Sequence, residues 1–369
     1  MNKQTRYGII GTAIAAALGG APVADADPQL RGRIHLDYAL YNSDVTPLND
    51  GFRVRRARLG ASGKFDDIWS YTSEVDFAEN GVDFKDMYLR HNDIAGGRLT
   101  IGQQKVPFSL EELTSSNNIT FMERASPNLF SLSRRIGAQW YRAGERSTFA
   151  VMGFGQAIGA GDGGDEGLGI GARFTFAPIK TDTSVLHLGI AGNTYEPTNS
   201  NNEVMRFRQR PESRNDGTRL VDTGNLADVD NATALGIEAA WVSGPLSIQG
   251  EYMTTTASRT AGDVTMNGYY VYGSWFLTGE NRRYSNGVFS GPRIANAERG
   301  AWEVGVRYSN LDLVDTGIDG GEMKNATFGV NWYPRSNVRF MFNYITVDTV
   351  RAGVSDDPSI VMFRTQVSF

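Results

Sequence analysis

The chain of 369 residues contains no cysteine and three histidines. Without cysteine it can form neither disulfide bonds nor thiolate metal sites, and it offers no cysteine nucleophile. The histidines are His35, His91 and His187, and none lies beside a G-x-S-x-G motif, the turn that presents the serine of many hydrolases. Hydrolysis by a serine-histidine pair is therefore a remote alternative for this chain.

Long apolar runs are also missing after the first 26 residues. No stretch of 18 consecutive apolar residues occurs there, which excludes membrane-spanning helices. Membrane-spanning β-strands pass this test, because each needs about 9–11 residues with every second one apolar. The formal net charge of −5 is too small to indicate what the protein binds.

The N-terminus has the pattern of a secretory signal peptide. Lys3 and Arg6 precede a run of small apolar residues, and an A-x-A cleavage site ends at Ala26. A membrane anchor is the weaker alternative, since the run is shorter than the ~20 apolar residues that a spanning helix needs. We therefore expect residues 1–26 to be removed and residues 27–369 to form one domain.

Strict alternation of apolar and polar residues runs through most of the chain. In residues 30–41, Ile34 and Leu36 alternate with Arg33 and His35, which places the two sets on opposite faces of a strand. The same pattern predicts about sixteen strands. They cover roughly residues 30–41, 52–65, 69–77, 84–91, 97–105, 135–142, 148–156, 168–176, 184–195, 232–242, 246–255, 267–277, 301–310, 324–333, 338–347 and 360–369.

An even number of antiparallel strands favours a closed barrel with both termini on one side. Several connections on that side are short, for example residues 66–67 and 243–245, and we expect the connections on the other side to be mostly long. One strand face carries the large apolar residues, edged with Trp and Tyr, as expected for contact with lipid. A secreted β-sandwich is less favoured, because so many strands would need an unusually large core. We therefore predict an all-β fold, a transmembrane antiparallel β-barrel.

The alternation stops between about residues 106 and 134. A loop of that length in a compact β-protein is usually functional or disordered. Residues such as Phe108, Phe121 and Phe130 argue against disorder, because disordered segments are poor in large apolar side chains. We expect this loop to be folded.

The face opposite the apolar one is rich in charge. Arginines cluster on the first two predicted strands, where Arg31, Arg33, Arg55, Arg56 and Arg58 outnumber the nearby acids. Guanidinium groups stay charged and bind phosphate or carboxylate oxygens in pairs. Arg135, which the alternation also turns inward, is a further candidate anion-binding residue. For inward residues outside the arginine cluster, pairing with neighbouring acids is an equally open interpretation.

Two further connections are unusual. Residues 197–231 contain the arginine-rich sequence RFRQRPESR, which could form an external funnel for anions or a solvated loop. Residues 278–300 exceed twenty residues on the side where turns should be short. We expect this second segment to fold back into the pore.

Several segments together resemble the phosphate-selective porin O and P family of Gram-negative outer membranes. They are DGFRVRRARLGASGKF, FKDMYLR, GQQKVPFSLEELTSSNNITFMERASP, RRIGAQW, YYVYGSWFLTGENRRY and GAWEVGVRYS, in the order of the family and across the predicted mature chain. The resemblance implies a homotrimer of sixteen-stranded barrels. It also implies that the loop at about residues 106–134 folds inward and forms the constriction.

The resemblance assigns site residues in part. It matches the family's arginines to Arg33, Arg55 and Arg56, its Thr-Ser-Ser to Thr114, Ser115 and Ser116, and its Glu-Arg pair to Glu123 and Arg124. Of these, the arginines and the hydroxyls of Ser115 and Ser116 are the expected anion-binding groups. The best-known phosphate channels of the family carry a lysine where this chain has Glu112, and here Lys85 stands beside Asp86. An acid in place of a cation weakens anion binding. We expect Lys85, Lys105 and Glu112 to modify selectivity.

The sequence thus predicts a passive outer-membrane porin for small anions, phosphate or polyphosphate in particular. A weakly selective porin, or one for another acidic solute, is the alternative that Glu112 favours. A surface adhesin with a plugged barrel is a third. The sequence supports no cofactor, metal site or nucleic-acid partner, and the acidic stretch at residues 159–167 lacks the spacing of calcium-binding loops.

Overall fold

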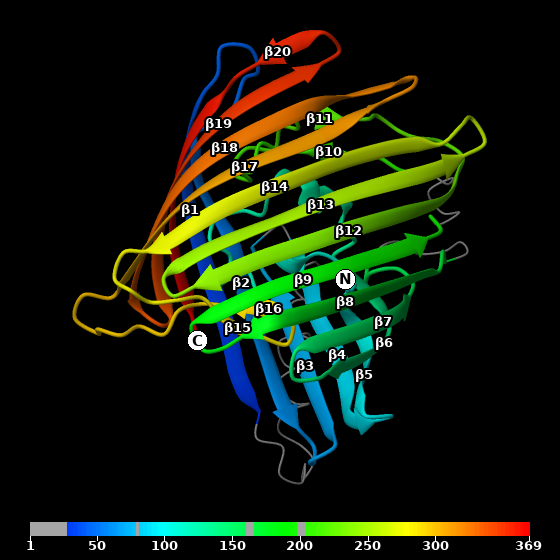
Figure 1. Ribbon diagram of the computed structural model, residues 1–369. Coiled ribbons are helices and arrows are strands. Elements are labelled where there is room, and N and C mark those ends of the chain that lie inside the picture. Colours follow the sequence, from blue (N-terminus) through cyan, green and yellow to red (C-terminus); the bar gives the residue numbers. More distant parts are fainter. Residues whose placement is uncertain (1–27, 79–80, 160–165, 198–203) are drawn as a thin grey trace, which may run out of the picture.

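The computed structural model describes residues 28–78, 81–159, 166–197 and 204–369 (Figure 1). The predicted signal peptide, residues 1–26, lies outside these ranges. Within them, sixteen long antiparallel strands close into a barrel, because β1 (Gln29–Asn42) pairs with both β2 (Gly51–Lys64) and β21 (Ser359–Ser368). No helix in the described ranges is long and apolar enough to cross a membrane.

The remaining barrel strands follow one another around the wall in chain order. They are β3 (Trp69–Asp76), β4 (Asp83–Ile94), β5 (Gly97–Lys105), β6 (Arg134–Ala143), β7 (Ser147–Phe154), β8 (Gly169–Lys180), β9 (Ser184–Tyr195), β12 (Val229–Ser243), β13 (Leu246–Arg259), β14 (Val264–Phe276), β17 (Ala301–Asp315), β18 (Ile318–Arg335) and β19 (Val338–Arg351). The short strand β20 (Val354–Asp356) turns back and pairs antiparallel with the end of β19. The prediction of a sixteen-stranded barrel is confirmed.

Period-two alternation sorts the side chains as expected. On β1, Arg33, His35 and Asp37 are buried inside the barrel, while Ile34 and Leu36 are 51% and 43% exposed on the outside. The outer face carries most of the large exposed apolar residues, including several Trp and Tyr. This face suits a lipid environment, and the polar face lines the lumen.

The prediction about connection lengths holds on one side and fails in part on the other. Beside the termini, β4 and β5 are joined by two residues, as are β12 and β13. On the opposite side, β17 and β18 are also joined by two residues, Thr316 and Gly317, where a long connection was expected. The strands extend beyond their predicted ends, and Gly317, with φ +76°, permits the tight turn.

The loop between β5 and β6, residues 106–133, folds into the barrel and is called here the constriction loop (Figure 1). It contains one turn of helix, α2 (Leu110–Leu113), and a 3-10 helix, η1 (Ser126–Phe130). Phe121 and Met122 on this loop are fully buried. The prediction of an inward-folded loop is confirmed.

Wall residues hold the constriction loop by its backbone. The Glu251 carboxyl on β13 accepts hydrogen bonds from the backbone N–H groups of Leu110 and Glu111, at 2.9 and 2.8 Å. On β19, Arg339 donates to the carbonyls of Ile119 and Thr120, at 2.7 and 2.9 Å. Because β13 and β19 are separated by three other strands, these contacts hold the loop at two separate places on the wall.

Two more connections enter the lumen. Residues 277–300 carry β15 (Arg283–Ser285) and β16 (Val288–Ser290), and this hairpin lies inside the barrel at the end that holds the termini (Figure 1). Tyr284 Oη hydrogen-bonds His187 Nδ1 at 2.7 Å, and Arg173 donates to the Gly287 carbonyl at 2.8 Å. The segment folds back into the pore, as the sequence predicts.

The connection between β9 and β12 also folds inward, with β10 (Arg208–Gln209) and β11 (Val221–Asp222) paired to each other. The Glu212 carboxylate accepts a hydrogen bond from Ser309 at 2.6 Å and pairs with Arg307 on the wall. Residues 204–228, called here the second inner loop, are therefore neither an external funnel nor a solvated loop. They pack beside the constriction loop.

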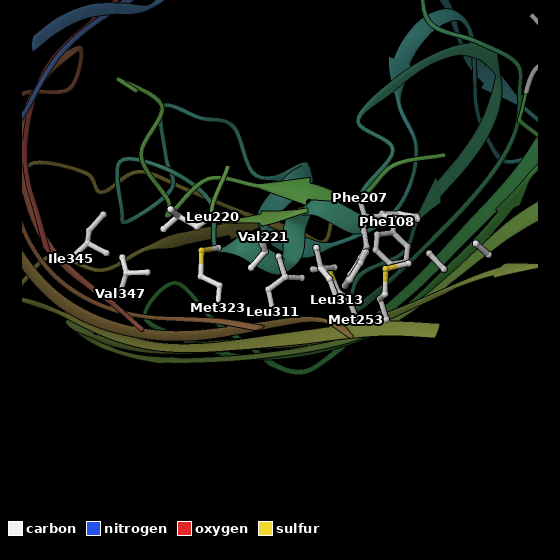
Figure 2. Close-up of a cluster of buried hydrophobic side chains, with 14 of the residues drawn as sticks. Phe108, Phe207, Leu220, Val221, Met253, Leu311, Leu313, Met323, Ile345 and Val347 are labelled. Atoms are coloured by element: carbon white, nitrogen blue, oxygen red, sulfur yellow. The ribbon is translucent and has the colours of Figure 1, made fainter. Parts of the chain in front are cut away.

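A hydrophobic cluster fills the space between these loops and one half of the wall (Figure 2). The wall contributes Met253, Leu311, Leu313, Met323, Ile345 and Val347, and the loops contribute Phe108, Phe207, Leu220 and Val221. The expectation of a polar inner face fails along this half, because loop side chains rather than water cover it. A cavity of about 670 Å³ lies on the other side of the constriction loop, against β1 to β6.

Candidate functional site

A cavity of about 670 Å³ lies between the constriction loop, the second inner loop and the wall of β1 to β6. Among the described residues, thirteen basic and six acidic side chains line it. The basic ones are Arg31, Arg33, Arg55, Arg56, Arg58, Lys85, Lys105, Arg124, Arg134, Arg208, Arg210, Arg214 and Arg219; the acidic ones are Asp76, Asp83, Asp86, Glu112, Glu123 and Glu212. Although the chain is acidic overall, this cavity is strongly positive.

A β-bulge puts two consecutive arginines into the cavity. His35 on β1 pairs with Arg56, but the next residue, Leu36, pairs with Val54, so Arg55 is the extra residue of β2. A bulge breaks the alternation of side chains. Arg55 and Arg56 therefore both point inward, where regular alternation would turn one of them toward lipid.

One carboxylate of the constriction loop neutralises several of these arginines. Glu123 lies 2.7 Å from Arg55 Nε, 2.8 Å from Arg364 Nη2 and 3.9 Å from Arg56 Nη1. Burial alone would raise the pKa of the Glu123 carboxyl, but these arginines hold it well below its ordinary value. Arg364 also pairs with Asp37 at 2.6 Å. Because two carboxylates serve three arginines, the cluster retains net positive charge.

The structure brings Arg33 together with the serines of the constriction loop. Arg33 Nη1 donates to Ser116 Oγ at 3.0 Å and to Ser115 Oγ at 3.3 Å, and its Nη2 pairs with Glu74 at 3.1 Å. Glu74 also pairs with Arg58 Nη1 at 3.1 Å. Since the two serines accept from Arg33, their hydroxyl hydrogens are available to an incoming acceptor.

Glu112 forms a compact cluster with two cations. Its carboxylate lies 3.3 Å from Lys105 Nζ and 3.1 Å from Arg124 Nε. Burial alone would raise the pKa of Glu112, but Arg124 and Lys105 lower it to about 2. Arg124 also donates to the Glu111 and Thr114 carbonyls, which closes the turn after α2. Glu112 therefore neutralises part of the charge of two cavity-lining cations.

The other departure from the family pattern, Lys85 beside Asp86, also lies at the cavity. Asp86 pairs with Arg134 through two hydrogen bonds, at 2.9 and 3.2 Å. Lys85 contacts Asp83. The two acids are thus each matched by a cation, and neither offers an unbalanced negative charge at the wall.

The sequence prediction for Arg135 does not fit the cavity. Arg134 lines it, whereas Arg135 lies on the other side of the constriction loop and lines a separate cavity. Ser133, with φ +57°, ends the loop in a left-handed conformation just before these residues. The backbone turn there decides which arginine faces the site, and alternation within β6 alone could not reveal it.

Sequence reasoning left the arginines of the second inner loop unassigned. Arg208, Arg210, Arg214 and Arg219 line the same cavity as the arginines of β1 and β2, and Arg214 lies 3.9 Å from Glu123. The RFRQRPESR motif contains three of them, and Arg219 follows it in the chain. The inward fold, fixed by Glu212, places them at the site.

The histidines make no contact typical of a hydrolase. His35 hydrogen-bonds Asn117 and Arg56, and His187 hydrogen-bonds Tyr284 and Glu238. His91 packs edge-on against Trp69, with ring centroids 4.8 Å apart. In the described ranges, none of the three hydrogen-bonds a serine.

Comparison with known proteins agrees with this architecture. Residues 29–369 match the family model "Phosphate-selective porin O and P". An uncharacterised protein of Caulobacter vibrioides is 30% identical over 343 residues, which cover 88% of this chain and 69% of that protein. Porin O of Pseudomonas aeruginosa is 28% identical over 379 residues, covering 90% and 86%.

Solved structures share the fold at low sequence identity. The anion-selective porin from Comamonas acidovorans superposes with a TM-score of 0.61 at 15% identity, covering 94% of this chain and 100% of that one. The trimer form of OmpT, an outer-membrane protein of Vibrio cholerae, gives 0.57 at 11% identity, covering 93% and 99%. With the family match across the whole barrel, this chain belongs to the phosphate-selective porin O and P family and is an outer-membrane porin, a channel without enzymatic activity.

Proposed function

We propose that this porin conducts small inorganic anions passively, and that phosphate or polyphosphate is its physiological solute. The excess of basic over acidic side chains around the 670 Å³ cavity carries this proposal. Low-dielectric walls focus the field of such a cluster, so it attracts anions although the net charge of the chain is negative.

The lining residues provide a sequence of donors for the anion. Arginines of the second inner loop, such as Arg208 and Arg219, meet an anion that arrives from the side opposite the termini. At the constriction, Arg33, Ser115 and Ser116 offer guanidinium and hydroxyl donors in place of water. Because the arginines are shared with carboxylates, each anion is held weakly enough to leave.

The alternative is a porin of weak selectivity, or one for another acidic solute. Glu112 favours it, because its carboxylate sits where an anion would otherwise contact Lys105 and Arg124. In that case the cavity would attract anions but would discriminate little among them.

The reversal potential of the purified protein in a planar bilayer tests the proposal. Under a KCl gradient we expect anion selectivity, and added phosphate should block the chloride current in the micromolar to millimolar range. Weak selectivity together with no block by phosphate would refute phosphate as the solute and would support the alternative.

We also propose that the protein forms a homotrimer and reaches the outer membrane after removal of residues 1–26. The resemblance to the family and the trimer form of OmpT support the trimer. Sedimentation in detergent should give three chains per particle, and the mature protein should begin at Asp27. A monomeric particle would contradict the first proposal, and an intact N-terminus would contradict the second.

A further inference from the structure

A second cavity, of about 200 Å³, lies on the other side of the constriction loop. It is bounded by β6, β9, β12, β13 and the second inner loop, and we call it the side pocket. Leu129 and Ser131 line both this pocket and the main cavity. A single layer of the constriction loop therefore separates the two.

The side pocket contains a cation that no carboxylate neutralises. Arg135 donates through Nη1 to the carbonyls of Leu132 and Arg134, at 2.8 and 2.9 Å. In the described part of the chain it forms no ion pair, whereas Arg134 beside it pairs with Asp86. The rest of the Arg135 guanidinium can therefore bind an anion from the pocket.

Two further polar groups of the pocket have no hydrogen-bond partner among the residues that the structure describes. Asn193 is 5% exposed, and its Nδ2 has no hydrogen-bond acceptor. Ser131 Oγ is also buried without a hydrogen bond. A buried donor without a partner costs about 1–3 kcal/mol, so the two orphaned groups indicate that a polar atom belongs in this pocket.

Most of the remaining lining is apolar, although Tyr195, Thr255 and Arg206, which pairs with Asp222, also line the pocket. Phe130 and Leu132 come from the constriction loop, and Met205 and Phe207 come from the second inner loop. A water molecule occupies ~30 Å³ in the liquid, so the volume of the pocket equals that of about six or seven water molecules. An inorganic dianion would leave these apolar walls in contact with water, whereas an organic anion would cover them.

We propose that the side pocket binds a small organic monoanion, a carboxylate joined to a compact apolar body about the size of one ring. Its carboxylate accepts from Arg135 and from Asn193 Nδ2, and its body packs against the contacting rings of Phe130 and Phe207. The site is distinct from the conducting cavity and does not depend on the solute proposed above. Because Leu129 and Ser131 also line the main cavity, an occupied side pocket supports the constriction loop from behind.

The test uses 4-fluorobenzoate and the purified, assembled porin, with binding followed by ¹⁹F NMR. 4-Fluorobenzyl alcohol, which has the same ring without the charge, measures partition into detergent. We expect Arg135→Gln to weaken fluorobenzoate binding at least about tenfold, since a charge-assisted hydrogen bond is lost. Arg98→Gln is the matched control, because Arg98 stacks on Tyr141 and lines neither cavity.

A second variant keeps the test valid if Arg135→Gln does not assemble. Ala234 lines the pocket and is 4% exposed, so Ala234→Leu fills the space without changing any charge. It should abolish binding of the probe. Equal affinity in wild type and Ala234→Leu would overturn the proposal, as would equal binding of the alcohol and the carboxylate. If inorganic phosphate displaced the probe and neither variant changed its affinity, the probe would be bound in the main cavity. That result would also overturn the proposal.

Discussion

Glu112 offers the sharpest test of how charge is arranged at the constriction. Glu112→Gln keeps the size of the side chain and removes one negative charge from between Lys105 and Arg124. Because the pKa of Glu112 is about 2, the carboxylate is ionised at every pH used for channel recordings. The substitution therefore removes a full charge. We expect anions to bind more tightly in the variant.

The size of the effect follows from the geometry. Lys105 Nζ lies 3.3 Å from the Glu112 carboxylate. An anion that contacts Lys105 at the ~2.8 Å of a charge-assisted hydrogen bond is then about 6 Å from Glu112. At that distance two unit charges repel by ~0.7 kcal/mol in water and by ~2.8 kcal/mol at an effective dielectric of 20. The variant should therefore bind a monoanion about threefold to about a hundredfold more tightly.

Single-channel recording in a planar bilayer measures this affinity as block of the chloride current. Nitrate and sulfate are suitable blockers, because the repulsion that is removed scales with the charge of the anion. We expect a larger gain for sulfate than for nitrate. The control is Glu145→Gln, since Glu145 is an exposed acid in the short connection between β6 and β7, outside the cavity lining.

Unchanged block by both anions in Glu112→Gln would refute the reasoning. It would mean that conducted anions do not approach Lys105 and Arg124. Weaker block in the variant would also refute the electrostatic reasoning. It would mean that the main role of Glu112 is to hold Lys105 and Arg124 in place. An equal gain for nitrate and sulfate would exclude a Coulombic origin.

Three further predictions concern pH, loop anchoring and the inner hairpin. The difference in anion selectivity between wild type and Glu112→Gln should stay constant from pH 4 to pH 8, because protonation of Glu112 begins only near its pKa of about 2. A difference that disappears toward pH 4 would contradict this prediction. Glu251→Ala should leave the N–H groups of Leu110 and Glu111 without acceptors, at a cost of about 1–3 kcal/mol each. The constriction loop should then be cleaved faster by added protease, and the open-channel current should be noisier. Unchanged cleavage and noise would show that other contacts hold the loop. Replacing residues 283–290 by a short glycine linker should raise the single-channel conductance, because that hairpin occupies the lumen beside β8 and β9. An unchanged conductance would mean that the hairpin does not form the narrowest part of the channel.

The sequence by itself determined the barrel. Alternation with period two is a local property, so it predicts each strand and its lipid-facing side from a few neighbouring residues, as on β1, where Arg33 and Ile34 take opposite faces. The break in alternation after Lys105 likewise marked the constriction loop. The resemblance to the family then supplied Arg33, Ser115 and Ser116, which the structure brings within hydrogen-bonding distance.

Only the tertiary structure decided the charge balance of the site. Glu123 meets Arg364, which is 241 residues away in the chain, and no local pattern links the two. The inward fold of the second inner loop and the apolar half of the lumen depend on each other, because apolar wall positions are favourable only where a loop covers them. Arg134, and not the predicted Arg135, lines the main cavity because of one backbone turn at Ser133. These features arise from contacts between segments distant in the chain, whereas alternation records only neighbours.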